Sequence, residues 1–235
     1  MTLIRIPKSG SKIGFNNNIG TSSFVILSNA TVTNPIGEQA TIVSTSVQDS
    51  STGTGIQKVR IRYFDNNWIL NDEIVTMNGT SPVNTEAIDI LRIETFEAFQ
   101  AGSDSFSVGT ITLKSIDETR LFAQIDPNNS IFNRALHFVS PGKTCEITDI
   151  TADCSTTGGL IFQIFETTDN TPDGGGPVLI PSVSFILANN TERISLNTPI
   201  RCDASRSTQG IQVGILVKGL AASQIGIASF HFNEL

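Results

Sequence analysis

Few residues in this sequence could support catalysis. The two histidines, His137 and His231, lie in the apolar, strand-like stretches ALHFV and FHF. A catalytic histidine needs a nucleophile or a carboxylate as its partner, and neither stretch supplies one at a recognisable spacing. We therefore predict that both histidines are ordinary strand residues and that the chain has no catalytic residue.

Candidate metal ligands are equally sparse. Cys145, Cys154 and Cys202 show no C-x-x-C spacing, and the Cys-Asp neighbours in DCSTTGG and RCDASRS are not a zinc pattern. Their odd number fits free, partly buried thiols, with a Cys145–Cys154 disulfide as the alternative. Asp169 and Asp173 resemble an acidic calcium loop but lack its ligand series with a terminal Glu. We predict no metal site and no cofactor, with adventitious calcium at this loop as the alternative.

Binding residues outside catalysis are limited to loops and one tryptophan. The loops GSDSFSVG and STGTG fit neither Walker nor Rossmann spacing and open no helix, so phosphate binding is not expected. Trp68, in YFDNNW, lies next to a turn. An exposed Trp could stack on a sugar, but such a residue more often covers the end of a sandwich core. The Gly- and Pro-rich segment 170–177 is expected to be an exposed loop.

The composition is typical of β structure and does not suit a nucleic-acid-binding protein. Of the 235 residues, 39% are hydrophobic and 16% charged, which is enough apolar material for one large or two modest domains. Ser, Thr, Asn and Gly dominate the polar residues, as in strands joined by many turns. The net charge of −7, without a basic stripe, repels phosphate backbones. Docking on a basic protein stays open, although an acidic balance mainly favours solubility.

The sequence shows no targeting segment. MTLIRIPKSGSK lacks the apolar centre of a signal peptide, and no stretch approaches the ~20 apolar residues of a membrane helix. We expect a soluble protein made in the cytosol, with no membrane partner. The glycosylation sequons at Asn29, Asn78, Asn128 and Asn189 are then accidents of an Asn- and Thr-rich sequence.

Period-two patterns predict strands from about residue 40 onward. In KVRIRYF, Val59, Ile61 and Tyr63 alternate with three basic residues, which indicates a half-buried strand. DEIVTM predicts a second strand. The pair Asn78-Gly79 that follows predicts a β-turn between strands, because both residue types tolerate positive φ.

Other segments are strand-like with some ambiguity. ILRIETFEAF (residues 90–99) fits a short helix or a strand; we favour a strand that forms a hairpin with SVGTITL (residues 107–113). In IQVGILVKG, alternating aliphatic residues are predicted to share one face of a strand: Ile211, Val213, Ile215 and Val217.

The predicted fold class is all-β, with two tandem β-sandwich (jelly-roll-like) domains and an extended N-terminal arm. About a dozen strands with turn signals roughly every 8–12 residues favour sandwiches. We assign residues 1–35 to the arm, 36–126 to the first sandwich and 134–235 to the second, joined by the loop DPNNSIFNR. A single elaborate jelly roll with an N-terminal arm is the alternative.

Two stretches resemble bacteriophage virion structural proteins. In residues 53–85, a Gly-rich lead is followed by a strand, an Asp-containing turn and a strand that ends in V-x-x-N-G-T. SPGKTCEITDI (residues 140–150) and the segments ISLNTPIRCDA and IQVGILVKG resemble strands of a later domain in such proteins. The resemblance covers about residues 40–235. The N-terminal arm and the long loop in FETTDNTPDGGGPV have no counterpart.

The resemblance implies a non-enzymatic virion protein with no catalytic residues to carry over. Its most direct reading is a capsid decoration (cement) or minor capsid protein that binds and stabilises the assembled head. It implies the major capsid protein or other virion proteins as partners, a homo-oligomer with a trimer favoured, and assembly in the host bacterial cytoplasm. The N-terminal arm would serve as an anchor.

Two other functions compete with this reading. A receptor-binding, head-fibre or tail-associated module would recognise host surface glycans through Trp68 and the loop 170–177. A glycan-degrading enzyme would need two carboxylates in distinct environments. The scattered acidic residues of this chain do not predict such a pair, so we expect no enzymatic activity.

Overall fold

The computed structural model describes residues 8–167, 178–187, 190–204 and 210–235. All regular elements in these ranges are β-strands, as the predicted fold class requires, and none is a helix that could span a membrane. The strands are β1 (Lys8–Ile19), β2 (Val25–Ile26), β3 (Ala40–Ser44), β4 (Ile56–Phe64), β5 (Leu70–Thr76), β6 (Val83–Asn84), β7 (Arg92–Ala101), β8 (Ile111–Ser115), β9 (Leu121–Ile125), β10 (Leu136–Val139), β11 (Thr144–Cys154), β12 (Leu160–Thr167), β13 (Val178–Leu187), β14 (Asn190–Asp203), β15 (Ile211–Gly219) and β16 (Gln224–Glu234).

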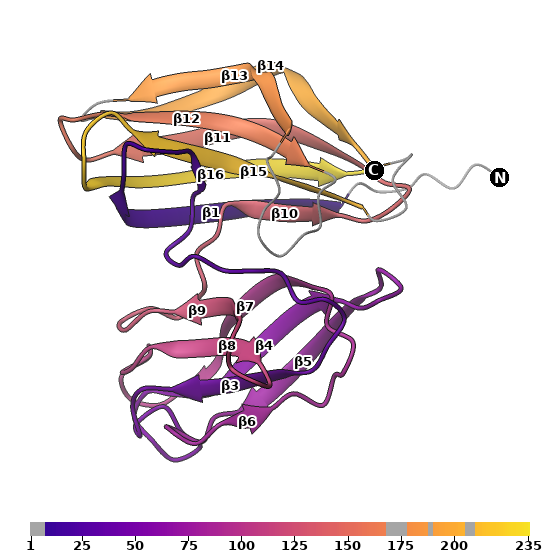
Figure 1. Ribbon diagram of the computed structural model, residues 1–235, viewed down its shortest axis with the longest axis vertical. Helices are drawn as coiled ribbons and strands as arrows, with labels where there is room; N and C mark the ends of the chain where they lie inside the picture. The colour runs from indigo at the N-terminus through magenta and orange to yellow at the C-terminus, as the bar shows by residue number, and fades with distance from the viewer. Residues whose placement is uncertain (1–7, 168–177, 188–189, 205–209) are drawn as a thin grey trace. The chain divides into compact units, whose positions relative to one another are not determined.

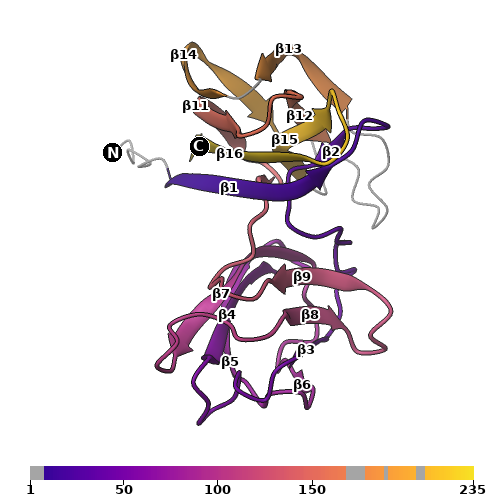
Figure 2. The same ribbon diagram turned by 90° about the vertical axis from the view of Figure 1, so that its left-hand side faces the viewer.

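The strands divide between two compact units (Figure 1). Among the described residues, one unit combines those up to Asn29 with those from Asn133 on, and we call it the split unit. The other, Ala30–Phe132, holds β3 to β9, and we call it the inserted unit. The inserted unit therefore interrupts the split unit between β2 and β10, and Figure 2 shows the two chain segments that connect them.

The split unit consists of two antiparallel sheets with nested strand pairs. The strand orders are β1-β16-β11-β14 and β10-β15-β12-β13, and β2 pairs with β15. Along the chain, the pair β12–β13 lies within β11–β14, which lies within β10–β15, which lies within β1–β16. The unit is thus one long antiparallel ribbon whose successive strand pairs alternate between the two sheets.

Apolar side chains from both sheets of the split unit form one core. Ile150 and Phe230 come from one sheet, and Phe162 and Leu160 come from the other. Two sheets that share a buried face in this way make a sandwich. The aliphatic residues predicted to share one face of a strand all lie in this core, on β15: Ile211, Val213, Ile215 and Val217.

The inserted unit is a second, smaller sandwich. Its sheets have the strand orders β6-β3-β8-β9 and β5-β4-β7, and its core draws on both, with Phe96 from one and Leu113 from the other. Val59, Ile61 and Tyr63 point into this core as their alternation predicts. The basic residues between them lie on the opposite, solvent-facing side of β4.

The connectivity of the units differs from the tandem arrangement with an arm over residues 1–35. Residues 8–19, inside that predicted arm, form β1 and pair with β16 from Lys8–Glu234 to Ile19–Gln224. The inserted unit also begins and ends outside the predicted limits 36–126. The reason is that a period-two pattern identifies a strand but not its partner, so the pairing of the first and last strands has no local signature.

The favoured strand at residues 90–99 is present as β7, but the predicted hairpin is wrong. β7 pairs with β4, whereas β8 pairs with β3 and β9 in the other sheet. The loop between them crosses from one sheet to the other. The hairpin was predicted because strands that are neighbours in the sequence often pair. Here β7 and β8 belong to different sheets, so they do not pair.

The predicted turn at Asn78-Gly79 is confirmed. The Ser81 amide donates to the Asn78 carbonyl oxygen at 3.1 Å, and Gly79 has a φ of +60°. Glycine adopts this conformation at little cost because it has no Cβ. The turn connects β5 with β6, which belong to different sheets of the inserted unit.

Candidate interaction surfaces

The loops of the inserted unit gather at two opposite ends of its sandwich. One end consists of residues 45–55, 77–82, 102–110 and 126–130, and we call it the Asp49 end. The other consists of residues 33–38, 65–69, 85–91 and 116–120, and we call it the Asp65 end. This division follows from the antiparallel pairing, because successive strands run the length of the sandwich in opposite directions. Loops held by a rigid β scaffold are common binding sites.

The carboxylate of Asp49 is the centre of the first end. It is fully buried and accepts hydrogen bonds from the Ser44 hydroxyl (2.6 Å) and the Ile56 amide (2.9 Å). It also accepts from the amides of Val108 (3.0 Å) and Gly109 (2.9 Å), about sixty positions along the chain. One buried side chain therefore ties the β3–β4 loop to the β7–β8 loop.

Gly109 is required by the close approach of these loops. A Cβ at this position would come within 2.6 Å of the Ser46 backbone nitrogen and 2.7 Å of the Thr45 hydroxyl. Backbone cannot yield like the end of a flexible side chain, so any larger residue would separate the loops. The glycine thus allows donors from both loops to reach the Asp49 carboxylate.

The Asp49 end exposes apolar side chains on this fixed platform. Val47 is 65% exposed, and Phe106 and Val108 are also exposed. Ser105, next to Phe106, has a φ of +64°, and the Ser107 backbone amide donates a hydrogen bond to the Asn129 carbonyl oxygen at 2.9 Å. The exposed residues are therefore presented by loops with fixed backbones.

Asp65 organises the other end through bonds to its own turn. Its Oδ1 accepts from the amides of Asn67 (2.8 Å) and Ile69 (2.9 Å), and its Oδ2 accepts from the Asn71 side-chain amide (3.0 Å). This is the local pattern by which Asp stabilises turns. It places Trp68 in the left-handed region, with a φ of +59°.

Trp68 is half-buried against its neighbours. Its ring lies 5.7 Å from the Phe64 ring, and the guanidinium carbon of Arg92 lies 5.8 Å from the Trp68 centroid. Burial lowers the pKa of Arg92 to about 10, and its Nη1 donates to the carbonyl oxygens of Leu91 and Pro35. Trp68 thus covers part of the sandwich end, which leaves less of its ring for stacking on a ligand.

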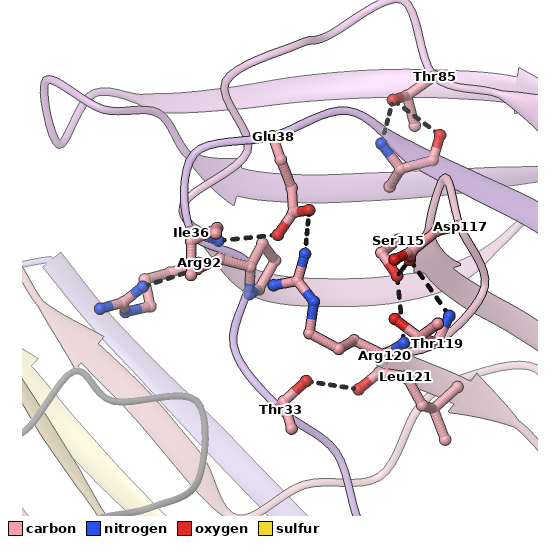
Figure 3. A network of polar contacts seen from close by, with 12 residues as sticks. Thr33, Ile36, Glu38, Thr85, Arg92, Ser115, Asp117, Thr119, Arg120 and Leu121 are labelled. Atoms are coloured by element: carbon pink, nitrogen blue, oxygen red, sulfur yellow. Dashed lines mark hydrogen bonds and ion pairs between the residues drawn. The ribbon is translucent and has the colours of Figure 1, made fainter.

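A polar network fixes the segment that leads into β3 (Figure 3). Glu38 forms an ion pair with Arg120, and its other oxygen accepts from the Ile36 amide at 3.1 Å. The Thr33 amide donates to the Leu121 carbonyl oxygen at 2.8 Å. These bonds hold the segment against the β8–β9 turn, so the Asp65 end is also built on fixed loops.

The two histidines lie in strands of the split unit, as expected from their apolar, strand-like surroundings. His137 is fully buried on β10, stacks on Phe232 at 3.8 Å and has its Nε2 3.4 Å from a Glu234 carboxylate oxygen. His231 is exposed on β16, with its Nδ1 2.8 Å from an Asp149 oxygen. Each histidine therefore has a carboxylate neighbour that the local sequence did not reveal.

The three cysteines are free and buried. Cys145 and Cys154 lie at opposite ends of β11, so the disulfide considered between them cannot form. Cys145 instead faces Cys202 across β11 and β14. Burial, followed by the nearby Glu166 carboxylate, raises the pKa of the Cys202 thiol, which keeps it protonated and unreactive.

The acidic segment that resembles a calcium loop follows β12 in the sequence. Asp169, Asp173 and the loop 170–177 lie outside the described residues. Among the residues that are described, no group of three His, Cys, Asp or Glu side chains could hold a metal ion.

Comparison with known proteins identifies no family. No protein-family model and no curated protein matches the chain. Structures of infectious bursal disease virus, Gt and Gx strains, are 8% and 9% identical, cover 97% and 99% of this chain and 71% and 73% of their own, and give TM-scores of 0.25 and 0.26. The major capsid protein P2 of bacteriophage PM2 is 10% identical, with 98% of both chains covered and a TM-score of 0.19. TM-scores this low do not establish a shared fold, so no role is transferred from these structures.

Proposed function

We propose that this chain is a non-enzymatic structural protein of a virus particle. The observation that carries the proposal is the strand order of the split unit. A four-stranded sheet and a five-stranded sheet, with eight of their strands paired as one rolled ribbon, are the arrangement expected of a double-sheet jelly roll, an architecture of viral capsid domains. The resemblance of residues 40–235 to phage virion proteins supports the same function.

The finer role is a capsid decoration (cement) or minor capsid protein, with virion proteins as partners. Both loop ends of the inserted unit offer fixed, partly apolar surfaces of the kind that bind protein partners. The anchoring role considered for residues 1–35 is not retained, because β1 is an integral strand of a sheet. We further propose a homotrimer that assembles on particles in the host bacterial cytoplasm.

Immunogold electron microscopy of particles from the source lysate tests this proposal. Antibody raised to the purified chain is expected to label particles at regular positions over the heads. Antibody pre-absorbed with the purified chain is the control. Absence of label from every particle would contradict a virion role, and light scattering of the purified chain would test the trimer.

A receptor-binding module that recognises glycans is the second candidate. It is favoured by Phe106, an exposed aromatic ring among the Ser- and Asn-rich loops of the Asp49 end, and jelly rolls also serve as lectins. Label confined to tails or fibres, together with glycan-array binding that Phe106→Ala abolishes, would support it over a head protein.

A further inference from the structure

Exposed isoleucines gather at the Asp65 end. Ile36, Ile69 and Ile88 are 60%, 57% and 70% exposed, and Ile116 is also exposed. Each comes from a different loop of the inserted unit. A single exposed aliphatic residue is ordinary on a protein surface, but several on adjoining loops are typical of a contact site.

Contacts around the segment 36–38 join these loops into one surface. The backbone of Gly37 lies directly against the Asn66 side chain, beside the loop that carries Ile69. The amides of Gly37 and Glu38 donate to the Ile90 carbonyl oxygen at 3.0 and 3.1 Å, beside Ile88. The Glu38–Arg120 ion pair reaches the turn that carries Ile116 (Figure 3).

Carboxylates flank the isoleucines on this surface. Glu86 and Asp89 lie on either side of Ile88, and Asp117 follows Ile116. None of these three carboxylates has an ion pair with a described residue. Asp89 lies near further negative charge, since it acts on Tyr63 together with two other carboxylates: burial, followed by the carboxylates of Glu73, Asp89 and Asp65, raises the pKa of Tyr63.

The backbone that presents these groups is fixed before any partner binds. The Glu73 carboxylate accepts from the amides of Glu86 (2.7 Å) and Ala87 (3.1 Å). Asp117 is held in its turn by the amide of Thr119 at 3.2 Å. Little conformational freedom would therefore be lost on binding, which favours affinity.

We propose that the Asp65 end is a docking surface for a basic protein segment in which Lys or Arg alternates with aliphatic residues. The methylene stems and aliphatic side chains would cover the isoleucines while the cationic heads reach the carboxylates. A wholly apolar partner would leave those carboxylates desolvated without compensation. A second copy of the same surface or a nucleic acid would be repelled by like charge. This inference does not depend on the proposed virion role.

Fluorescence anisotropy of a labelled peptide with alternating Lys and Leu, titrated with the full chain, tests the inference. We expect binding that weakens with salt. The variant Ile36→Ser/Ile88→Ser should bind about tenfold more weakly, whereas the control Ile186→Ser/Leu220→Ser, which removes exposed aliphatic residues of the split unit, should bind as before. A peptide with Ser in place of Leu should bind more weakly to the unaltered chain.

Two charge variants distinguish binding at this surface from general attraction of a basic peptide to an acidic protein. Glu86→Lys/Asp89→Lys should lose at least about tenfold in affinity, and Asp104→Lys/Glu146→Lys, with the same net charge, should lose much less. Thermal unfolding followed by circular dichroism, which reports on the strands of both units, confirms that each variant is folded. Equal loss in the two charge variants, equal binding of the Ser-containing peptide, or unchanged binding of Ile36→Ser/Ile88→Ser would each overturn the inference.

Discussion

Asp49 and Asp65 both organise loops with a carboxylate, yet they do so over very different spans of the chain. Asp65 binds groups two, four and six positions away, in its own turn and at the start of β5. Asp49 binds Ser44 and Ile56 nearby but also Val108 and Gly109, in a loop that other strands bring to it. The Asp65 turn can form as soon as its own residues meet, whereas the Asp49 site exists only once both sheets are in place.

The two aspartates also differ in burial. Asp49 is fully buried and satisfies its charge with donors from two loops, while Asp65 retains 8% exposure. A buried carboxylate is tolerated when hydrogen bonds replace its lost hydration, and its removal then leaves several donors without a partner. We therefore expect the two aspartates to contribute unequally to stability.

Asp49→Ala should have the largest effect. The substitution leaves three backbone amides and one hydroxyl without a hydrogen-bond acceptor in a buried site. We therefore expect the free energy of unfolding of the inserted unit to fall by about 3–5 kcal/mol. Urea unfolding followed by the fluorescence of Trp68, the only tryptophan, reports on this unit. Asp49→Asn, which keeps the shape and one acceptor, should be intermediate. A loss of unfolding free energy no greater than that of Asp65→Ala would contradict the unequal contribution of the two aspartates.

Gly109→Ala should follow, with a loss of about 1–3 kcal/mol. The added methyl group would press on the Ser46 backbone and separate the two loops that share Asp49. Gly20→Ala is the matched control, because nothing lies within 4 Å of the corresponding Cβ. Thermal unfolding by circular dichroism should show a lower midpoint for the first variant only; equal midpoints would argue against tight loop contact.

Asp65→Ala should cost less, about 1–2 kcal/mol, because its turn is more accessible to water, which can replace part of the lost bonding. The same urea titration with Trp68 fluorescence measures the change. Since Trp68 lies in this turn, a shifted emission maximum of the folded variant is also expected. An unchanged spectrum together with a loss equal to that of Asp49→Ala would contradict the local role of Asp65.

The Glu38–Arg120 ion pair should contribute least at the Asp65 end. Both side chains are about a quarter exposed, so we expect a coupling energy of about 0.5–1 kcal/mol in a double-mutant cycle of Glu38→Gln and Arg120→Met. The coupling should decrease in high salt. A coupling that salt does not change would indicate a pair shielded from solvent.

Glu166 of the split unit is a half-buried acid and can be compared with the two aspartates. Burial raises its pKa above the ordinary 4.5, so the folded protein holds this proton more tightly than the unfolded chain does. The resulting stability is present below pH 4.5 and is lost as the pH rises through the folded-state pKa. Glu166→Gln should remove this slope from unfolding free energies measured over that range. A slope unchanged by the substitution would assign it to another group.

Local sequence patterns predicted the strands, the Asn78-Gly79 turn and the buried face of β4, because each depends on residues only a few positions apart. They did not predict the hairpin partner of β7 or the place of β1, because a period of two is the same whichever strand lies alongside. Asp49 carried only a weak signal, an acidic residue in a Ser-, Gly- and Thr-rich loop. The neighbours that define its role lie about sixty residues away.

Composition and short-range patterns indicated that this protein is built from strands, that its net charge of −7 disfavours polyanion binding and that a turn lies next to Trp68. Only the tertiary structure decided that β1 pairs with β16 around an inserted sandwich and that Asp49 joins two distant loops. It also brought the loops that carry exposed isoleucines to one end of the inserted unit. Such features depend on which segments meet in three dimensions, and that outcome is set by the packing of whole sheets.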